Sequence, residues 1–182
     1  MKYLLGVFLL LIEMTHGSFV WGLTIDEAYQ AIPHKRTQYD AQRSTLSMSE
    51  REFLTKLFSL SDEALVERMT TLAALREGSR SQLAQYEARV TRILETLRAL
   101  PEPASASGLA ATLGQAIEHQ RAFFRTAFAS PTHEVKIGTN PNVRTASNEL
   151  RRLYADLMTR YGAEHPHNRD AFYQHLCALD FL

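Results

Sequence analysis

Two basic segments are the parts of this sequence whose residue types and spacing could form a binding site. The first contains His34, Lys35 and Arg36 after a proline, and the second places Lys136 and Arg144 on either side of a Gly/Asn/Pro-rich turn. Basic side chains and the free N–H groups of a helix N-terminus bind carboxylates and phosphates. If the two segments meet in space, the sequence predicts a site for an anionic small molecule or a protein partner. Two ordinary solvated loops are the alternative.

Histidine and cysteine side chains near the end of the chain form a second candidate, a metal site. Imidazole and thiolate groups together are a ligand set for copper or zinc. On a helix, however, residues two apart point in different directions. A solvated turn with a buried cysteine is therefore the alternative interpretation. The residues concerned are His165, His167, His175 and Cys177.

Haem is the other cofactor that a helical protein of this size could hold. Covalent c-type haem needs C-x-x-C-H, which a chain with one cysteine cannot supply. A methionine and a histidine on facing helices could hold a non-covalent haem, although methionine in a helical core is usually filler. We therefore predict no cofactor and keep copper or haem as the alternative. The candidate haem ligands are Met69 or Met158 with His119 or His175.

Catalytic and nucleotide-binding motifs give no reason to assert an enzyme. The sequence contains no G-x-S-x-G, H-E-x-x-H, Walker or G-x-G-x-x-G pattern, although catalytic groups can also come from distant residues. Basic and acidic residues both number 20, so the net charge does not favour nucleic acid. The sequence predicts a binding or accessory protein without catalysis.

The first 22 residues have the pattern of an export signal. Lys2 precedes an apolar run over residues 4–12, which Glu13 ends well before the roughly 20 residues that span a membrane. Cleavage after Gly17 or after Gly22 fits the small-residue rule, and we favour the second. We therefore expect a periplasmic or secreted protein without stable membrane insertion. Cys177 cannot form an intrachain disulfide, which leaves a covalent homodimer open.

Helical periodicity predicts the elements that must position these side chains. An apolar stripe with spacings of three and four runs along residues 83–100. Similar stripes predict helices over about 47–77, 109–129 and 143–161, with short helices after Thr24 and Asn168. We expect one all-α domain, an antiparallel four-helix up-down bundle (47–182) with short extra N- and C-terminal helices and an extended loop before residue 47. The central stripe is Leu83, Tyr86, Val90, Ile93, Leu97 and Leu100.

Several helix boundaries follow from capping and turn residues. Thr24 with Glu27, and Ser47 with Glu50, have the capping-box spacing. Gly78 allows either a hairpin or one continuous helix over 47–100, and we favour the hairpin because a mid-helix glycine costs about 1 kcal/mol. The Ser-Asp-Glu triplet at 61–63 could begin a new helix and so kink or split the first. Gly162 is predicted to end the helix at Tyr161.

Overall fold

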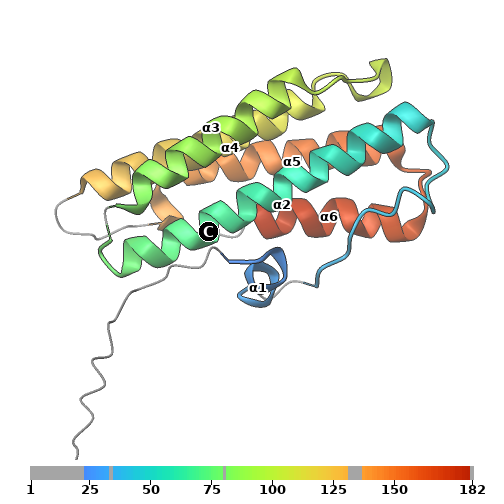
Figure 1. The fold of residues 1–182 in the computed structure, drawn as a ribbon. Helices are drawn as coiled ribbons and strands as arrows, with labels where there is room; N and C mark the ends of the chain where they lie inside the picture. The colour runs from blue at the N-terminus through green and yellow to red at the C-terminus, as the bar shows by residue number, and fades with distance from the viewer. Residues whose placement is uncertain (1–22, 33–34, 80, 131–136, 181–182) are drawn as a thin grey trace, which may run out of the picture.

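The computed structural model describes residues 23–32, 35–79, 81–130 and 137–180 (Figure 1). This part of the chain is all-α, as predicted, and contains no strand. No helix in it is long and apolar enough to cross a membrane. The predicted signal segment 1–22 and the last two residues lie outside the described residues. The α-helices are α1 (Ile25–Gln30), α2 (Met48–Arg76), α3 (Gln82–Ala99), α4 (Leu109–Ala129), α5 (Pro141–Tyr161) and α6 (Pro166–Asp180), with short 3₁₀ turns at Ala104–Ala106 and Ile137–Thr139.

Helices that follow one another in the chain lie side by side. The helix α2 packs against α3, α4 and α6, and α4 packs between α3 and α5. The helix α6 lies along both α2 and α5 (Figure 1). With 15 residues, α6 is longer than the short terminal helix that the sequence predicts. The four-helix arrangement is therefore not confirmed, because α6 packs as a further full member.

The turn after α2 is a hairpin. Gly78 adopts a left-handed conformation with φ of 73°, which L-residues other than glycine rarely adopt. The Ser79 amide donates to the Ala74 carbonyl, which closes the end of α2. The helix α2 is continuous from Met48 to Arg76, so the expected new helix at 61–63 is wrong. Ser61 and Asp62 are instead buried inside α2.

Both capping boxes are present in the structure. The Thr24 hydroxyl accepts from the Glu27 amide while Glu27 accepts from the Thr24 amide, and Ser47 and Glu50 do the same at the start of α2. Each box satisfies amide groups that a helix start leaves unpaired. Gly162 caps α5 directly after Tyr161, as predicted, and does so in the right-handed helical region.

The predicted central stripe lies in the core. Its inner members on α3 are at most 3% exposed, and burial of each such side chain stabilises the fold by about 1.5–3 kcal/mol. The core also holds Arg68 of α2, which is fully buried and donates to the Leu179 and Ala178 carbonyls at the end of α6. Burial lowers the pKa of the Arg68 guanidinium. The buried stripe residues are Tyr86, Val90, Ile93 and Leu97.

We call residues 23–46 the N-terminal arm. Residues 35–46 of the arm are not helical, and contacts from Thr37 and Asp40 hold them against α6. Thr37 donates to Asp170 at 2.7 Å, and Asn168 bonds both the amide and the carbonyl of Asp40 at 2.9 and 3.0 Å. Asn168 is therefore not the predicted cap of the last helix, which begins at Pro166. The ring of Tyr39 contacts both Phe58 of α2 and Phe172 of α6, which stack on each other with centroids 5.5 Å apart.

Candidate functional site

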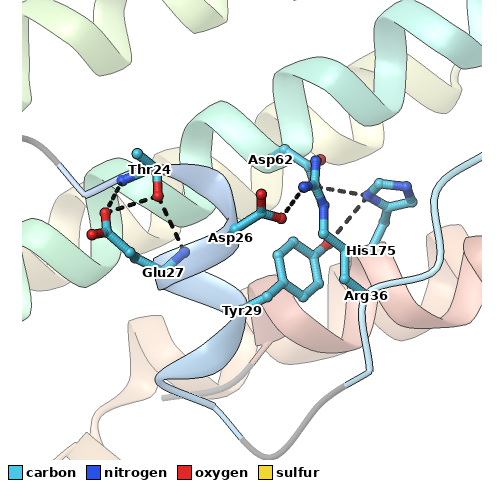
Figure 2. A network of polar contacts seen from close by, with 7 residues as sticks. All are labelled: Thr24, Asp26, Glu27, Tyr29, Arg36, Asp62 and His175. Atoms are coloured by element: carbon cyan, nitrogen blue, oxygen red, sulfur yellow. Dashed lines mark hydrogen bonds and ion pairs between the residues drawn. The ribbon is translucent and has the colours of Figure 1, made fainter.

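A buried cluster of polar side chains joins the N-terminal arm to α2 and α6 (Figure 2). Asp62 of α2 accepts hydrogen bonds at Oδ1 from the Tyr29 hydroxyl at 2.9 Å and from Nδ1 of His175 at 2.7 Å. The second Asp62 oxygen lies 3.8 Å from the Arg36 guanidinium. Tyr29, Asp62 and His175 are 3–5% exposed. We call these four residues the Asp62 cluster.

Helical spacing explains why these polar groups are buried. Asp62 lies four residues after Phe58 and three before Leu65, so it occupies a position in the apolar stripe of α2. His175 occupies the equivalent position of α6, three residues after Phe172. The Phe58 ring stacks on the His175 ring with centroids 4.8 Å apart. Core packing therefore brings the two polar groups together.

Burial determines the protonation of Tyr29. Burial, with the neighbouring Asp62 charge, raises the pKa of the Tyr29 hydroxyl, so this group stays protonated and donates. Nδ1 of His175 lies 2.7 Å from the Asp62 oxygen that accepts this hydrogen bond. Buried charges need such partners, because their desolvation is costly. His175 is 3% exposed, so the cluster's geometry suits fixing the arm better than transferring a proton to a dissolved substrate.

Arg36 connects the buried cluster to the surface. Its guanidinium carbon lies 5.7 Å from the centre of the Tyr29 ring, within the range of a cation–π contact. Its Nη1 group pairs with the carboxylate of Asp26 in the first turn of α1 (Figure 2). Arg36 thus bridges two carboxylates, one buried and one at the surface.

A surface groove of about 760 Å³ lies beside Arg36. Most of its described lining residues are polar or charged, and they include the cationic side chains of Lys35 and Arg36 together with His167. The carboxylates in the lining have basic partners, since Asp26 pairs with Arg36 and Asp40 pairs with Arg43 at 3.0 Å. The lining residues that the structure describes are Asp26, Lys35, Arg36, Thr37, Gln38, Tyr39, Asp40, Ala41, Gln42 and His167.

The structure places part of the predicted basic site in this groove. Lys35 and Arg36 line it side by side. Arg144 is exposed in the first turn of α5, next to Asn142, whose side chain contacts His119 of α4 at 3.4 Å. The described lining of the groove therefore does not include Arg144. His34 and Lys136 lie outside the described residues.

The four predicted metal ligands point to different surroundings. His167 contacts the Gln38 carbonyl, His165 accepts from the His167 amide, and His175 faces Asp62. Cys177 lines a separate hollow of about 230 Å³ with Tyr154 and Tyr173. Within the ranges that the structure describes, no group of three or more His, Cys, Asp or Glu side chains could hold a metal ion.

Sequence reasoning did not single out Tyr29, Asp26 or Asp62. A usable signal existed for Asp62, because an aspartate at an apolar-stripe position of a helix must find buried partners. Nothing in the sequence identifies those partners, which lie 33 and 113 residues away in the chain. Tyr29 resembles any other aromatic side chain on the inner face of a short helix.

Comparisons with known proteins add no relative. The search covered family models, curated protein sequences and solved structures. A function for the chain must therefore rest on the geometry of its own groove and cluster. None of the three comparisons finds a match to this chain.

Proposed function

We propose that this chain is an exported binding or accessory protein without catalysis, and that the groove beside Arg36 binds an acidic segment of a partner protein. One observation carries the proposal. The guanidinium of Arg36 already holds a carboxylate at the rim of the groove, that of Asp26, with Lys35 next to it. The groove thus presents cationic groups in an arrangement that accepts a carboxylate.

The lining of the groove favours a peptide over a small molecule. Small-molecule sites are mostly apolar with a few polar groups, whereas eight of the ten residues described in this lining are polar or charged. A polar segment with acidic side chains would exchange its contacts with water for contacts with Lys35, Arg36 and His167. The rest of the arm is held by hydrogen bonds to α6, which keeps the groove in place for binding.

The helices would act as a rigid frame for this surface. We infer that neighbouring helices are antiparallel, in an up-down arrangement. Packed helices of this kind would hold the binding residues, which lie on a non-helical segment, in position. Export is inferred from the sequence of residues 1–22. N-terminal sequencing of the mature protein from the producing cell tests it, and a mature chain that begins at Met1 would contradict it.

Binding of a defined peptide tests the proposed surface. We would measure fluorescence anisotropy with a labelled Gly-Glu repeat peptide and with a Gly-Lys peptide of equal length. We expect the acidic peptide to bind more tightly, and Arg36→Ala to weaken its binding by at least about tenfold, as for a charge-assisted hydrogen bond. Lys35→Ala is the second variant, since exposed Lys35 is not needed for folding.

Arg92→Ala provides the matched control. Arg92 is exposed on α3, away from the groove, and its removal changes the net charge by the same amount. Equal binding of the two peptides would contradict the proposal. So would variants of Lys35 and Arg92 that weaken acidic-peptide binding equally, because the effect would then come from net charge alone.

A further inference from the structure

The two carboxylates that pair with Arg36 differ in how firmly they are held. The side chain of Asp62 is 7% exposed and has two further donors, Tyr29 and His175. The side chain of Asp26 is 71% exposed, and the polar contact that it makes within the described residues is the ion pair with Arg36. The Arg36 side chain is only 22% exposed. The arginine and the buried carboxylate are therefore fixed, whereas Asp26 can move into solvent.

Release of Asp26 would leave α1 intact. The start of this helix is closed by the capping box of Thr24 and Glu27, in which Asp26 takes no part (Figure 2). Tyr29 and Ala28 hold the inner face of the helix in the core. Rotation of the Asp26 side chain away from Arg36 thus breaks one exposed ion pair, and such pairs contribute little to folding stability.

Arg36 keeps its position when Asp26 leaves. Its second amino group stays near Asp62, and its guanidinium carbon stays over the Tyr29 ring. The vacated Nη1 group borders the groove, where Lys35 also lies. An incoming carboxylate would find one fixed arginine donor and a neighbouring ammonium group.

We infer that the Asp26 carboxylate occupies the place on Arg36 that a carboxylate of the ligand takes on binding. An acidic side chain of the partner displaces Asp26 from Arg36. This inference rests on the proposed function and specifies its ligand as a carboxylate-bearing segment. Asp26 then lowers the affinity of the groove for acidic ligands and selects against weakly bound anions. Removing its charge must tighten acidic binding, which a purely structural ion pair would not do.

The test uses the full chain, the Gly-Glu peptide and the variant Asp26→Asn. Asparagine keeps the shape of the side chain but pairs weakly with arginine. We expect the variant to bind the acidic peptide about two- to fivefold more tightly, the range set by the strength of exposed ion pairs. Glu95→Gln is the control, because Glu95 is an exposed acid on α3 and its removal changes net charge equally.

The outcomes separate this inference from the proposed function. If neither the unmodified chain nor Asp26→Asn binds the acidic peptide, both the proposed function and the inference are wrong. If the unmodified chain binds and Asp26→Asn leaves the affinity unchanged, lowers it or raises it no more than Glu95→Gln does, the inference alone is wrong. Tighter binding by Asp26→Asn alone supports it.

Discussion

Replacement of Asp62 by alanine is the perturbation that bears most directly on the buried cluster. The change removes the acceptor that Tyr29 and His175 share and one of the two carboxylates that pair with Arg36. Water cannot readily replace the lost carboxylate, because Asp62 is 5% exposed. Two buried donors to a charged acceptor, at about 1.5–2 kcal/mol each, give a loss of about 3–4 kcal/mol in the free energy of unfolding.

Urea denaturation followed by circular dichroism measures this loss. With a slope of about 2 kcal/mol per molar urea, we expect the midpoint of Asp62→Ala to fall by about 1.5–2 M at constant slope. Glu63→Ala is the control, because Glu63 is the next residue of α2 and is only half-buried. We expect the control to lose less than about 0.5 kcal/mol.

A double-mutant cycle shows whether the loss comes from the cluster. Tyr29→Phe alone removes one donor and should cost about 1–2 kcal/mol, because Asp62 is left with fewer partners. In the Asp62→Ala background the same change should cost much less, since its acceptor is already gone. Additive effects of the two changes, or a midpoint for Asp62→Ala equal to that of Glu63→Ala, would refute this account of the cluster.

Three further predictions concern acid, alkali and the buried arginine. A hydrogen bond from Thr37 lowers the pKa of Asp170. The stability that this carboxylate contributes is therefore present at neutral pH and is lost as the pH falls below about 4. Thermal unfolding between pH 7 and 3 should show this loss, and an unchanged melting temperature would contradict it. Burial raises the pKa of Tyr39 to about 12. The contribution of the protonated Tyr39 hydroxyl to folding stability is therefore present below about pH 10 and is lost as the pH rises through 12. Absorbance at 295 nm should show that tyrosine ionisation is delayed in the folded chain, and Tyr39→Phe should reduce the delayed part of the signal. Arg68→Met removes the two Arg68 donors to the Ala178 and Leu179 carbonyls and leaves the Gln120 donor to Leu179. It should destabilise the fold by about 1–3 kcal/mol, with faster amide exchange in the last turn of α6. Exchange equal to that of the unmodified chain would contradict this role.

Much of the fold could be predicted because its signals are local. The capping boxes at Thr24 and Ser47 and the stripe around Val90 depend on residues three or four apart, which a sequence displays directly. The hairpin at Gly78 follows from the conformational freedom of glycine. These features determine where helices begin and end.

The errors arose where distant residues override local preference. Asn168 has the composition of a helix cap, but it bonds Asp40 of the arm, 128 residues away. The Ser-Asp-Glu triplet at 61–63 has the composition of a helix start, but packing on Tyr29 and His175 keeps Asp62 inside α2. The helix α6 begins at Pro166, a residue type that is favoured at the first helical position, and therefore starts before the predicted cap Asn168.

The candidate site was predicted only in part for the same reason. The basic character of Lys35 and Arg36 is visible in the sequence, and both residues line the groove. Their carboxylate partners Asp26 and Asp62 come from two different helices, and no pattern in the sequence links them to Arg36. The electrostatic balance of the groove therefore required the structure.

Backbone amide NMR of the isotopically labelled chain during titration with the Gly-Glu peptide tests the central claim most directly. Binding at the groove should shift the amides of residues 35–42, together with those of Asp26 and His167, which complete its lining. Saturable shifts confined to this set would support an acidic-segment binding surface beside Arg36. Shifts centred on the separate groove between α3 and α4, near Leu97 and Gly114, or the absence of any saturable shift, would contradict it.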